Sequence, residues 1–300
     1  MSPRGAAESR TSGTAARGHD RLPDRPIWID GRLCRGEEAG LSLFDRGARD
    51  GEGLFETLRI YRGRPFQWER HLERLVVSAA ELGFPVPPPP STLLAATEEV
   101  LASGGLLDAV IRITVTRGIS GRRPGRCGCW VDAEPLGSRL WRGARSALAA
   151  AIFSRRAFHP GSLGRHKTTS RLAYHLARDE ARAAAADEAL LVSAEGAALE
   201  GTSSNLFVVI GGEVLTPPLS AGILPGITRA FVLSACAELG IPARECTLSR
   251  EQVIGADEVF LTSSVQEVVP LARVDGREIP GRAVGMRVLE AYSGSVVATA

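Results

Sequence analysis

The chain has 300 residues and a mass of 31.8 kDa, which is enough for one large domain or two ordinary ones and excludes a small scaffold held by disulfides or a structural metal. Hydrophobic residues make up 44% and charged residues 23%, with 36 basic against 34 acidic residues and a net charge of +2. This balance is typical of a globular protein and favours neither nucleic acid nor an anionic membrane surface as a partner.

Targeting and cysteine signals are weak throughout the chain. No window approaches the ~18 consecutive apolar residues of a membrane-spanning helix, and the first 25 residues lack the apolar core of a secretory signal, so we expect a cytoplasmic protein. The cysteines number five and show no paired C-x-x-C spacing, which predicts no metal site and free thiols, most of them buried. They are Cys34, Cys127, Cys129, Cys236 and Cys246.

The first predicted elements follow a tail at residues 1–25, which lacks apolar periodicity and is expected to be flexible. A strand that starts at Ile27 ends at the hairpin signal Asp30-Gly31, and further strands alternate in hydrophobicity. Helices are predicted where apolar residues recur every three or four positions. The strands are expected at 27–30, 54–61 and 110–117, the last with a polar face, and the helices at 68–83 and 91–103.

The second half of the chain begins after a segment of poor periodicity at residues 125–162, where Gly, Pro and Arg accumulate. This segment suits a crossing between domains, and a boundary near residue 137 gives domains at 26–136 and 137–300. Strands are predicted at 188–193, 205–210, 213–216, 257–262 and 267–273, and helices at 169–186, 228–239 and 282–292. Because strands and helices mix without strict alternation, the sequence predicts an α+β, or mixed α/β, fold rather than a doubly wound parallel sheet.

One residue stands out by composition. Lys167 is the only lysine among the 36 basic residues, although a bias toward arginine explains the depletion itself. Arginine can replace lysine as a positive charge, but not as an amine that loses its proton and attacks a carbonyl. Lys167 is therefore a candidate nucleophile, the alternative being that one lysine escaped replacement by chance.

Two segments could bind a phosphate. The run Gly222-Ile-Leu-Pro-Gly-Ile-Thr-Arg229 opens the helix predicted at 228–239, so the amides of Ile227 and Thr228 would point outward, although ordinary capping after a Pro-Gly turn is the alternative. The hydroxyls of Thr262-Ser-Ser264 at a strand end could add donors, or simply cap a turn.

Two charged residues complete the candidate site. Arg74, on the helix at 68–83, could bind a phosphate through two N–H groups or be a solvated surface arginine. Glu200 lies between apolar strands, where a buried carboxylate needs a cationic partner, unless it lies on an exposed turn. An amine nucleophile, a phosphate cradle with an arginine, and a carboxylate for a protonated ring nitrogen are together the needs of pyridoxal 5'-phosphate.

The sequence also resembles the class IV (fold type IV) pyridoxal-phosphate enzymes, which include branched-chain and D-amino acid aminotransferases and 4-amino-4-deoxychorismate lyase. The resemblance runs from about Ile27 to Tyr292 and implies two α/β domains with the cofactor between them, usually in homodimers. The matching segments are Asp45-Arg-Gly47, Gly51-Glu-Gly-Leu-Phe-Glu-Thr57, His71-Leu-Glu-Arg-Leu75, Arg112 to Gly118, His166-Lys-Thr-Thr169, Glu200-Gly-Thr-Ser-Ser-Asn-Leu-Phe207, Thr216-Pro-Pro218, Gly222 to Arg229 and Asp257-Glu-Val-Phe260.

Carried over position by position, the resemblance implies that Lys167 holds the cofactor as a Schiff base and moves the substrate proton. It further implies that Glu200 faces the pyridine nitrogen. The phosphate would be held by Arg74, Ile227, Thr228 and Ser264. The glycine-punctuated loop Arg117-Gly-Ile-Ser-Gly-Arg122 carries Arg122, which the resemblance to D-amino acid aminotransferase marks as the residue that binds the substrate carboxylate.

The reaction is predicted from subfamily detail. Arg112 to Gly118 departs from the tyrosine and arginine pattern of branched-chain enzymes, and Pro124 stands where the D-amino acid enzymes have a histidine. His166-Lys-Thr-Thr followed by Arg171 and Tyr174 resembles the lyase. We therefore expect the lyase of folate biosynthesis, which releases pyruvate and forms 4-aminobenzoate, with an aminotransferase of branched-chain or D-amino acids as the alternative. A non-catalytic binding module would require a broken site.

Overall fold

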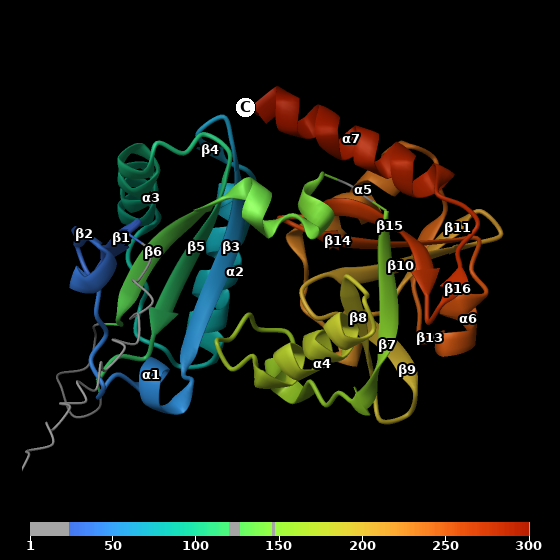
Figure 1. Ribbon diagram of the computed structural model, residues 1–300, viewed down its shortest axis with the longest axis horizontal. Helices are drawn as coiled ribbons and strands as arrows, with labels where there is room; N and C mark the ends of the chain where they lie inside the picture. Colours follow the sequence, from blue (N-terminus) through green and yellow to red (C-terminus); the bar gives the residue numbers. More distant parts are fainter. Residues whose placement is uncertain (1–23, 120–126, 146–147, 300) are drawn as a thin grey trace, which may run out of the picture.

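The computed structural model describes residues 24–119, 127–145 and 148–299, whose strands form two sheets in two lobes that lie side by side (Figure 1). Strands of the first sheet lie between Pro26 and Pro135, and strands of the second lie between Ala149 and Glu278. The mixed α/β fold is confirmed, whereas the domain boundary near residue 137 stays a prediction. The tail expected at 1–25 lies almost entirely outside the described residues.

The first sheet has six antiparallel strands in the order β2-β1-β6-β5-β3-β4. The predicted hairpin is confirmed, because Asp30 and Gly31 both have positive φ, 48° and 99°, as a tight two-residue turn requires. Its elements are β1 (Pro26–Ile29), β2 (Arg32–Arg35), β3 (Gly53–Tyr61), β4 (Arg64–Pro65), β5 (Ala109–Thr116) and β6 (Cys129–Pro135), with helices α1 (Arg46–Asp50), α2 (Trp68–Glu81) and α3 (Pro90–Gly104).

Helices α2 and α3 pack on this sheet and form one apolar core with it. In β3 the side chains of Leu54, Leu58 and Ile60 enter that core, because alternate residues of a strand share a face. Phe55 and Thr57 then project from the opposite face, toward the second lobe. The polar face predicted for β5 is confirmed in the same way, since Arg112 lines a cavity there.

The second sheet has ten strands, and β9 pairs with both β8 and β10, so that β10, β14, β15, β7, β8 and β9 form a closed ring around an apolar core. Its strands are β7 (Ala149–Ala157), β8 (Glu188–Val192), β9 (Ala197–Gly201), β10 (Asn205–Ile210), β11 (Glu213–Thr216), β12 (Ala243–Glu245), β13 (Leu248–Ser249), β14 (Glu258–Ser263), β15 (Glu267–Val274) and β16 (Arg277–Glu278). The helices are α4 (Leu172–Ala183), α5 (Ile227–Glu238), α6 (Arg250–Ile254) and α7 (Ala283–Thr299).

The predicted helices and the predicted strands are all present, but the segment at 125–162 differs from the expectation of a crossing. It contains two sheet strands, β6 and β7. β7 begins with three buried alanines: Ala149 and Ala151 belong to the core of the ring, and α4 packs against β7, so its start shows no alternation. The final helix is longer than the predicted 282–292.

The cysteines agree with the prediction, since all five are free thiols and four are buried, with only Cys246 partly exposed. Within the described ranges, no helix is both long and apolar enough to cross a membrane. The same residues contain no group of three or more metal-binding side chains.

Candidate functional site

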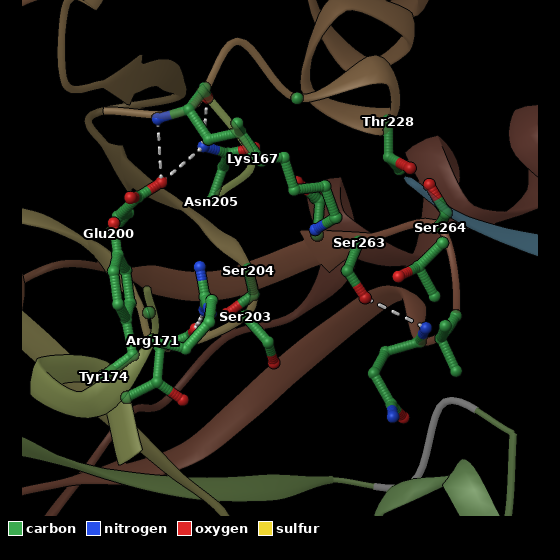
Figure 2. A pocket seen from close by; sticks show the side chains of 18 of the residues that line it. Lys167, Arg171, Tyr174, Glu200, Ser203, Ser204, Asn205, Thr228, Ser263 and Ser264 are labelled. Atoms are coloured by element: carbon green, nitrogen blue, oxygen red, sulfur yellow. Dashed lines mark hydrogen bonds between the residues drawn. The ribbon is translucent and has the colours of Figure 1, made fainter. Parts of the chain in front are cut away.

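A cavity of about 670 Å³ lies between the two sheets and is lined by residues of both. The first sheet contributes Phe55, Thr57 and Arg112, and helix α2 contributes Arg74. The second lobe contributes Lys167, Glu200, the start of α5 and the turn between β14 and β15 (Figure 2). This one cavity is lined by all the described residues that the sequence predicted for the site: Arg74, Lys167, Glu200, Ile227, Thr228 and Ser264.

Lys167 is held in place by the first sheet, although it lies far from that sheet in the sequence. Its carbonyl accepts a hydrogen bond from the Phe55 amide at 2.9 Å, and the Thr169 amide donates to the Gly53 carbonyl at 2.8 Å. The amine of Lys167 lies 4.8 Å from the centroid of the Phe55 ring. The start of β3 therefore fixes where the amine enters the cavity.

The environment of Lys167 favours the neutral amine. The surrounding protein withholds water from the ammonium form, and Arg74 and Arg171 repel its charge, so the pKa of Lys167 is lowered to about 7. An amine with this pKa is largely unprotonated at pH 8 and can act as a nucleophile. This agrees with the role expected for the only lysine of the chain.

Glu200 is a buried carboxyl without a cationic partner at hydrogen-bond distance among the described residues. The amide of Leu224 and the side-chain amide of Asn205 both donate to its Oε2, each at 3.2 Å (Figure 2). Burial raises the pKa of Glu200 to about 8, and these partners do not reverse that. Among the described residues, Arg171 and Lys167 oppose this shift only from a distance, and neither forms an ion pair with Glu200.

The start of α5 presents free amides to the cavity. Ile227 and Thr228 are its first residues, and no side chain of the described residues caps this helix. Gly226 precedes them, and a Cβ there would lie 1.9 Å from Oδ1 of Asn205, so only glycine allows Asn205 to reach Glu200. Amides at a helix N-terminus attract anions.

Arg74 differs in detail from the expectation. Its two-pronged contact is made with Glu56, whose oxygens accept from Nε and Nη2 at 2.7 Å each, and Nη1 donates to the Pro225 carbonyl at 2.9 Å. The fork is therefore occupied by a protein carboxylate. Only the remaining N–H groups at the end of the guanidinium can reach a ligand in the cavity.

Of the two remaining predicted site residues, Ser264 is described by the structure and Arg122 is not. Ser264 follows β14, and Figure 2 shows its hydroxyl directed toward that of Thr228. Its Oγ lies 3.2 Å from Nε2 of His71. Arg122 falls outside the described residues, so its role stays a prediction.

Five arginines that sequence reasoning did not select as site residues also line the cavity, and two of them, Arg112 and Arg171, lie near Phe55. The guanidinium of Arg112 lies 3.8 Å from the centroid of the Phe55 ring, and that of Arg171 lies 6.0 Å from it. In the described part of the chain neither forms an ion pair, although Arg171 donates to the Thr202 carbonyl. Arg112 could have been found from the sequence, because it lies on the polar face predicted for the strand at 110–117. For Arg171 the only sequence signal was its place in the segment that resembles the lyase.

The residues present fit pyridoxal 5'-phosphate. Within the described part of the chain, the cavity combines an amine with a lowered pKa, a buried carboxyl that forms no ion pair, and helix-start amides with an arginine nearby. A protonated pyridine ring and a phosphate group supply the missing cation and the missing anion. The fold and site thus define an enzyme that uses this cofactor between two lobes.

Comparison with known proteins agrees. The model of the family "amino-transferase class IV" matches residues 53–274. The chain is 34% identical over 268 residues to a putative branched-chain-amino-acid aminotransferase of Methanocaldococcus jannaschii, covering 86% of this chain and 91% of the relative. The chain belongs to the class IV aminotransferase family, and its cofactor is pyridoxal 5'-phosphate.

Solved structures show the same relationship. A branched-chain aminotransferase of Thermoproteus uzoniensis with norvaline has a TM-score of 0.82 and 33% identity, covering 91% of this chain and 95% of the other. A putative 4-amino-4-deoxychorismate lyase of Legionella pneumophila has a TM-score of 0.78 and 25% identity, with coverages of 85% and 95%. Fold type IV, expected from the resemblance, is confirmed.

Proposed function

We propose that this chain is an aminotransferase that moves the amino group of a small aliphatic amino acid to a 2-oxo acid. The observation that supports this proposal is the likeness to branched-chain aminotransferases over about nine-tenths of both chains, including the one whose structure contains norvaline. The lyase expected first from the sequence has weaker support, from one structure of lower identity. It remains the second candidate.

The proposed roles follow from the site. When bound, pyridoxal 5'-phosphate supplies an electron sink for the carbon that bears the amino group. Lys167, with its pKa of about 7, binds the cofactor. At neutral pH its amine also removes the proton from the substrate carbon that bears the amino group and delivers it to the cofactor. Glu200 faces the ring nitrogen and keeps it protonated, because a buried carboxylate and a cation stabilise each other.

The phosphate side is assigned to the amides of Ile227 and Thr228, the hydroxyl of Ser264 and the free end of Arg74. These groups would provide charge-assisted hydrogen bonds to the phosphate, and Thr228 and Ser264 lie at the opposite side of the cavity from Glu200 (Figure 2). A phosphate held by these groups would leave Glu200, at the other side of the cavity, to pair with the ring nitrogen.

The substrate carboxylate is assigned to the unpaired arginines. Arg112 and Arg171 flank Phe55 near Lys167, and burial lowers the pKa of both guanidinium groups, which marks a site where a bound anion is favourable. Arg122 remains a proposed second ligand. Arg112→Ala and Arg122→Ala, assayed side by side, should lose at least tenfold in kcat/KM at whichever position binds the carboxylate, without loss of bound cofactor.

Acceptor dependence separates the two reactions. The purified chain would receive L- and D-forms of alanine, norvaline, valine and leucine, with and without 2-oxoglutarate or pyruvate, and separately aminodeoxychorismate alone. An aminotransferase turns over repeatedly only when the 2-oxo acid is present. Continuous release of 4-aminobenzoate and pyruvate without any acceptor, and no amino acid turnover, would replace the proposal with the lyase.

The homodimer expected from the family is also a proposal. Its test is the mass of the loaded enzyme in solution, measured by light scattering against the 31.8 kDa of one chain.

A further inference from the structure

Three hydrogen-bonded side chains, of which Glu56 and His71 are buried and Ser264 is half-buried, connect the two lobes beside the proposed phosphate site. Nδ1 of His71, on α2, lies 2.7 Å from Oε2 of Glu56, on β3. Nε2 of the same ring lies 3.2 Å from Oγ of Ser264, in the turn after β14. Glu56 and His71 are each 1% exposed, so water does not complete their hydrogen bonds.

The charge state of Glu56 determines which of the hydrogen bonds among Glu56, His71 and Ser264 carry a hydrogen from His71. Arg74 and His71 hold the pKa of the Glu56 carboxyl far below its usual range despite burial, so Glu56 is a carboxylate and only accepts hydrogen bonds. Nδ1 of His71 must therefore carry a hydrogen. Whether Nε2 also carries one decides what Ser264 can do.

The two protonation states of His71 give Ser264 opposite roles. If the ring is neutral, Nε2 is an acceptor, and the Ser264 hydroxyl donates its only hydrogen to it. The Ser264 oxygen then directs only lone pairs into the cavity, and these repel the negatively charged oxygens of a phosphate. If the ring is cationic, Nε2 donates to Ser264, and the hydroxyl hydrogen is free for a phosphate oxygen.

The charges around His71 are nearly balanced without a ligand. Glu56 on β3 is paired with Arg74 on the same helix as His71, Lys167 lies on the segment attached to β3, and Ser264 is uncharged. Burial, Arg74 and Lys167 lower the pKa of His71, and Glu56 opposes them, so the ring is neutral at pH 7 in the free protein. A phosphate dianion at Ser264 adds negative charge and favours the cationic ring.

We propose that binding of the cofactor's phosphate is coupled to the uptake of one proton by His71, which turns Ser264 from a donor to the protein into a donor to the phosphate. The inference rests on the phosphate lying at Ser264 and the start of α5, as in the proposed function, but not on the identity of the amino acid substrate. Glu56 and His71 are positioning residues, since neither needs to touch the cofactor.

The direct test is the protonation state of His71 in the loaded enzyme. The chain has five histidines, so selective 15N labelling of histidine gives a simple spectrum, and His71→Gln identifies the signals of residue 71. We expect both ring nitrogens of His71 to carry hydrogen in the loaded enzyme at pH 7, and only Nδ1 in the cofactor-free chain. A bare Nε2 in the loaded enzyme from pH 6 to 9 would overturn the proposal.

A second measurement covers the case in which His71→Gln does not fold. Affinity for pyridoxamine 5'-phosphate is measured for the full cofactor-free chain and for Ser264→Ala between pH 7 and 9. Because each comparison is made at one pH, the ionisation of the probe, Lys167 and Glu200 cancels. The wild type should bind about tenfold or more tightly at pH 7, and this ratio should fall toward one once His71 loses its proton in the complex.

Ser263→Ala is the matched control. Ser263 also lines the cavity, but its hydroxyl accepts from the Gln266 amide and has no histidine partner among the described residues. Its affinity ratio should not change with pH. A ratio for Ser264→Ala that is equally constant would reject the coupling, and this result is independent of whether any amino acid is transaminated.

Discussion

Replacing Glu200 with glutamine should have opposite effects on the cofactor-free and loaded protein. In the unfolded chain this carboxyl ionises near pH 4.5, whereas burial raises its pKa to about 8 in the folded, cofactor-free protein. Between these two values folding requires the uptake of a proton, so the free energy of unfolding falls as pH rises. Glutamine resembles the protonated form in shape and does not titrate.

The magnitude follows from the two pKa values. Linkage puts the cost of burying Glu200 at about 2 kcal/mol at pH 6, about 3 kcal/mol at pH 7 and about 4 kcal/mol at pH 8. The difference in unfolding free energy between cofactor-free Glu200→Gln and the cofactor-free wild type should therefore increase by about 2 kcal/mol, in favour of the variant, from pH 6 to pH 8. Urea denaturation across this range measures the gain directly.

Two controls separate this effect from a general loss of charge. Glu290→Gln removes an exposed carboxylate on α7 and should show no such trend. In the loaded enzyme the sign reverses, because glutamine cannot pair with a protonated ring nitrogen, and turnover should fall by orders of magnitude. A stability difference that is constant with pH, or full turnover in Glu200→Gln, would refute the assignment of Glu200.

Three further variants test other parts of the site. Lys167→Ala should lose the yellow cofactor that borohydride fixes to the protein, together with nearly all turnover, and an adduct that survives in the variant would assign the cofactor elsewhere. Arg74→Ala should lower cofactor affinity about 10 to 150-fold, with rescue by excess cofactor, since roughly 1.5 to 3 kcal/mol of charge-assisted bonding is lost; unchanged affinity in a titration would contradict the phosphate role. Gly226→Ala should lower the unfolding free energy by about 1 to 3 kcal/mol and displace Asn205, whereas Gly294→Ala, with open space around its Cβ, should not; equal stabilities would contradict the close approach.

Periodicity and turn chemistry allowed much of the local structure to be predicted from sequence. The helix at 68–83 and the strand at 110–117 were found because their apolar residues match the repeat of each structure, and the Asp30-Gly31 turn because few residues tolerate positive φ. β7 was missed because its start is buried on both faces, by the core of the ring on one side and by α4 on the other, which removes the alternation that marks a half-exposed strand.

Composition and motif also identified the chemistry of the site. A sole lysine in an arginine-rich chain indicated an amine that must lose its proton, and the lowered pKa of Lys167 agrees with that reason. The glycine before α5 indicated a helix start that presents free amides to the cavity. These properties depend on residue type and on neighbours close in the sequence, which is why the sequence by itself was enough.

Only the tertiary structure decided which groups meet. The sequence suggested that Arg74 binds a phosphate through two N–H groups. The fold instead places the buried carboxylate of Glu56 next to Arg74, and Nε and Nη2 of Arg74 donate to it. Likewise, β3 aligns Lys167, and Ser264 meets His71 across 193 residues. Local sequence patterns carry no information about such contacts, because they form only when separate strands, helices and loops pack together and exclude water.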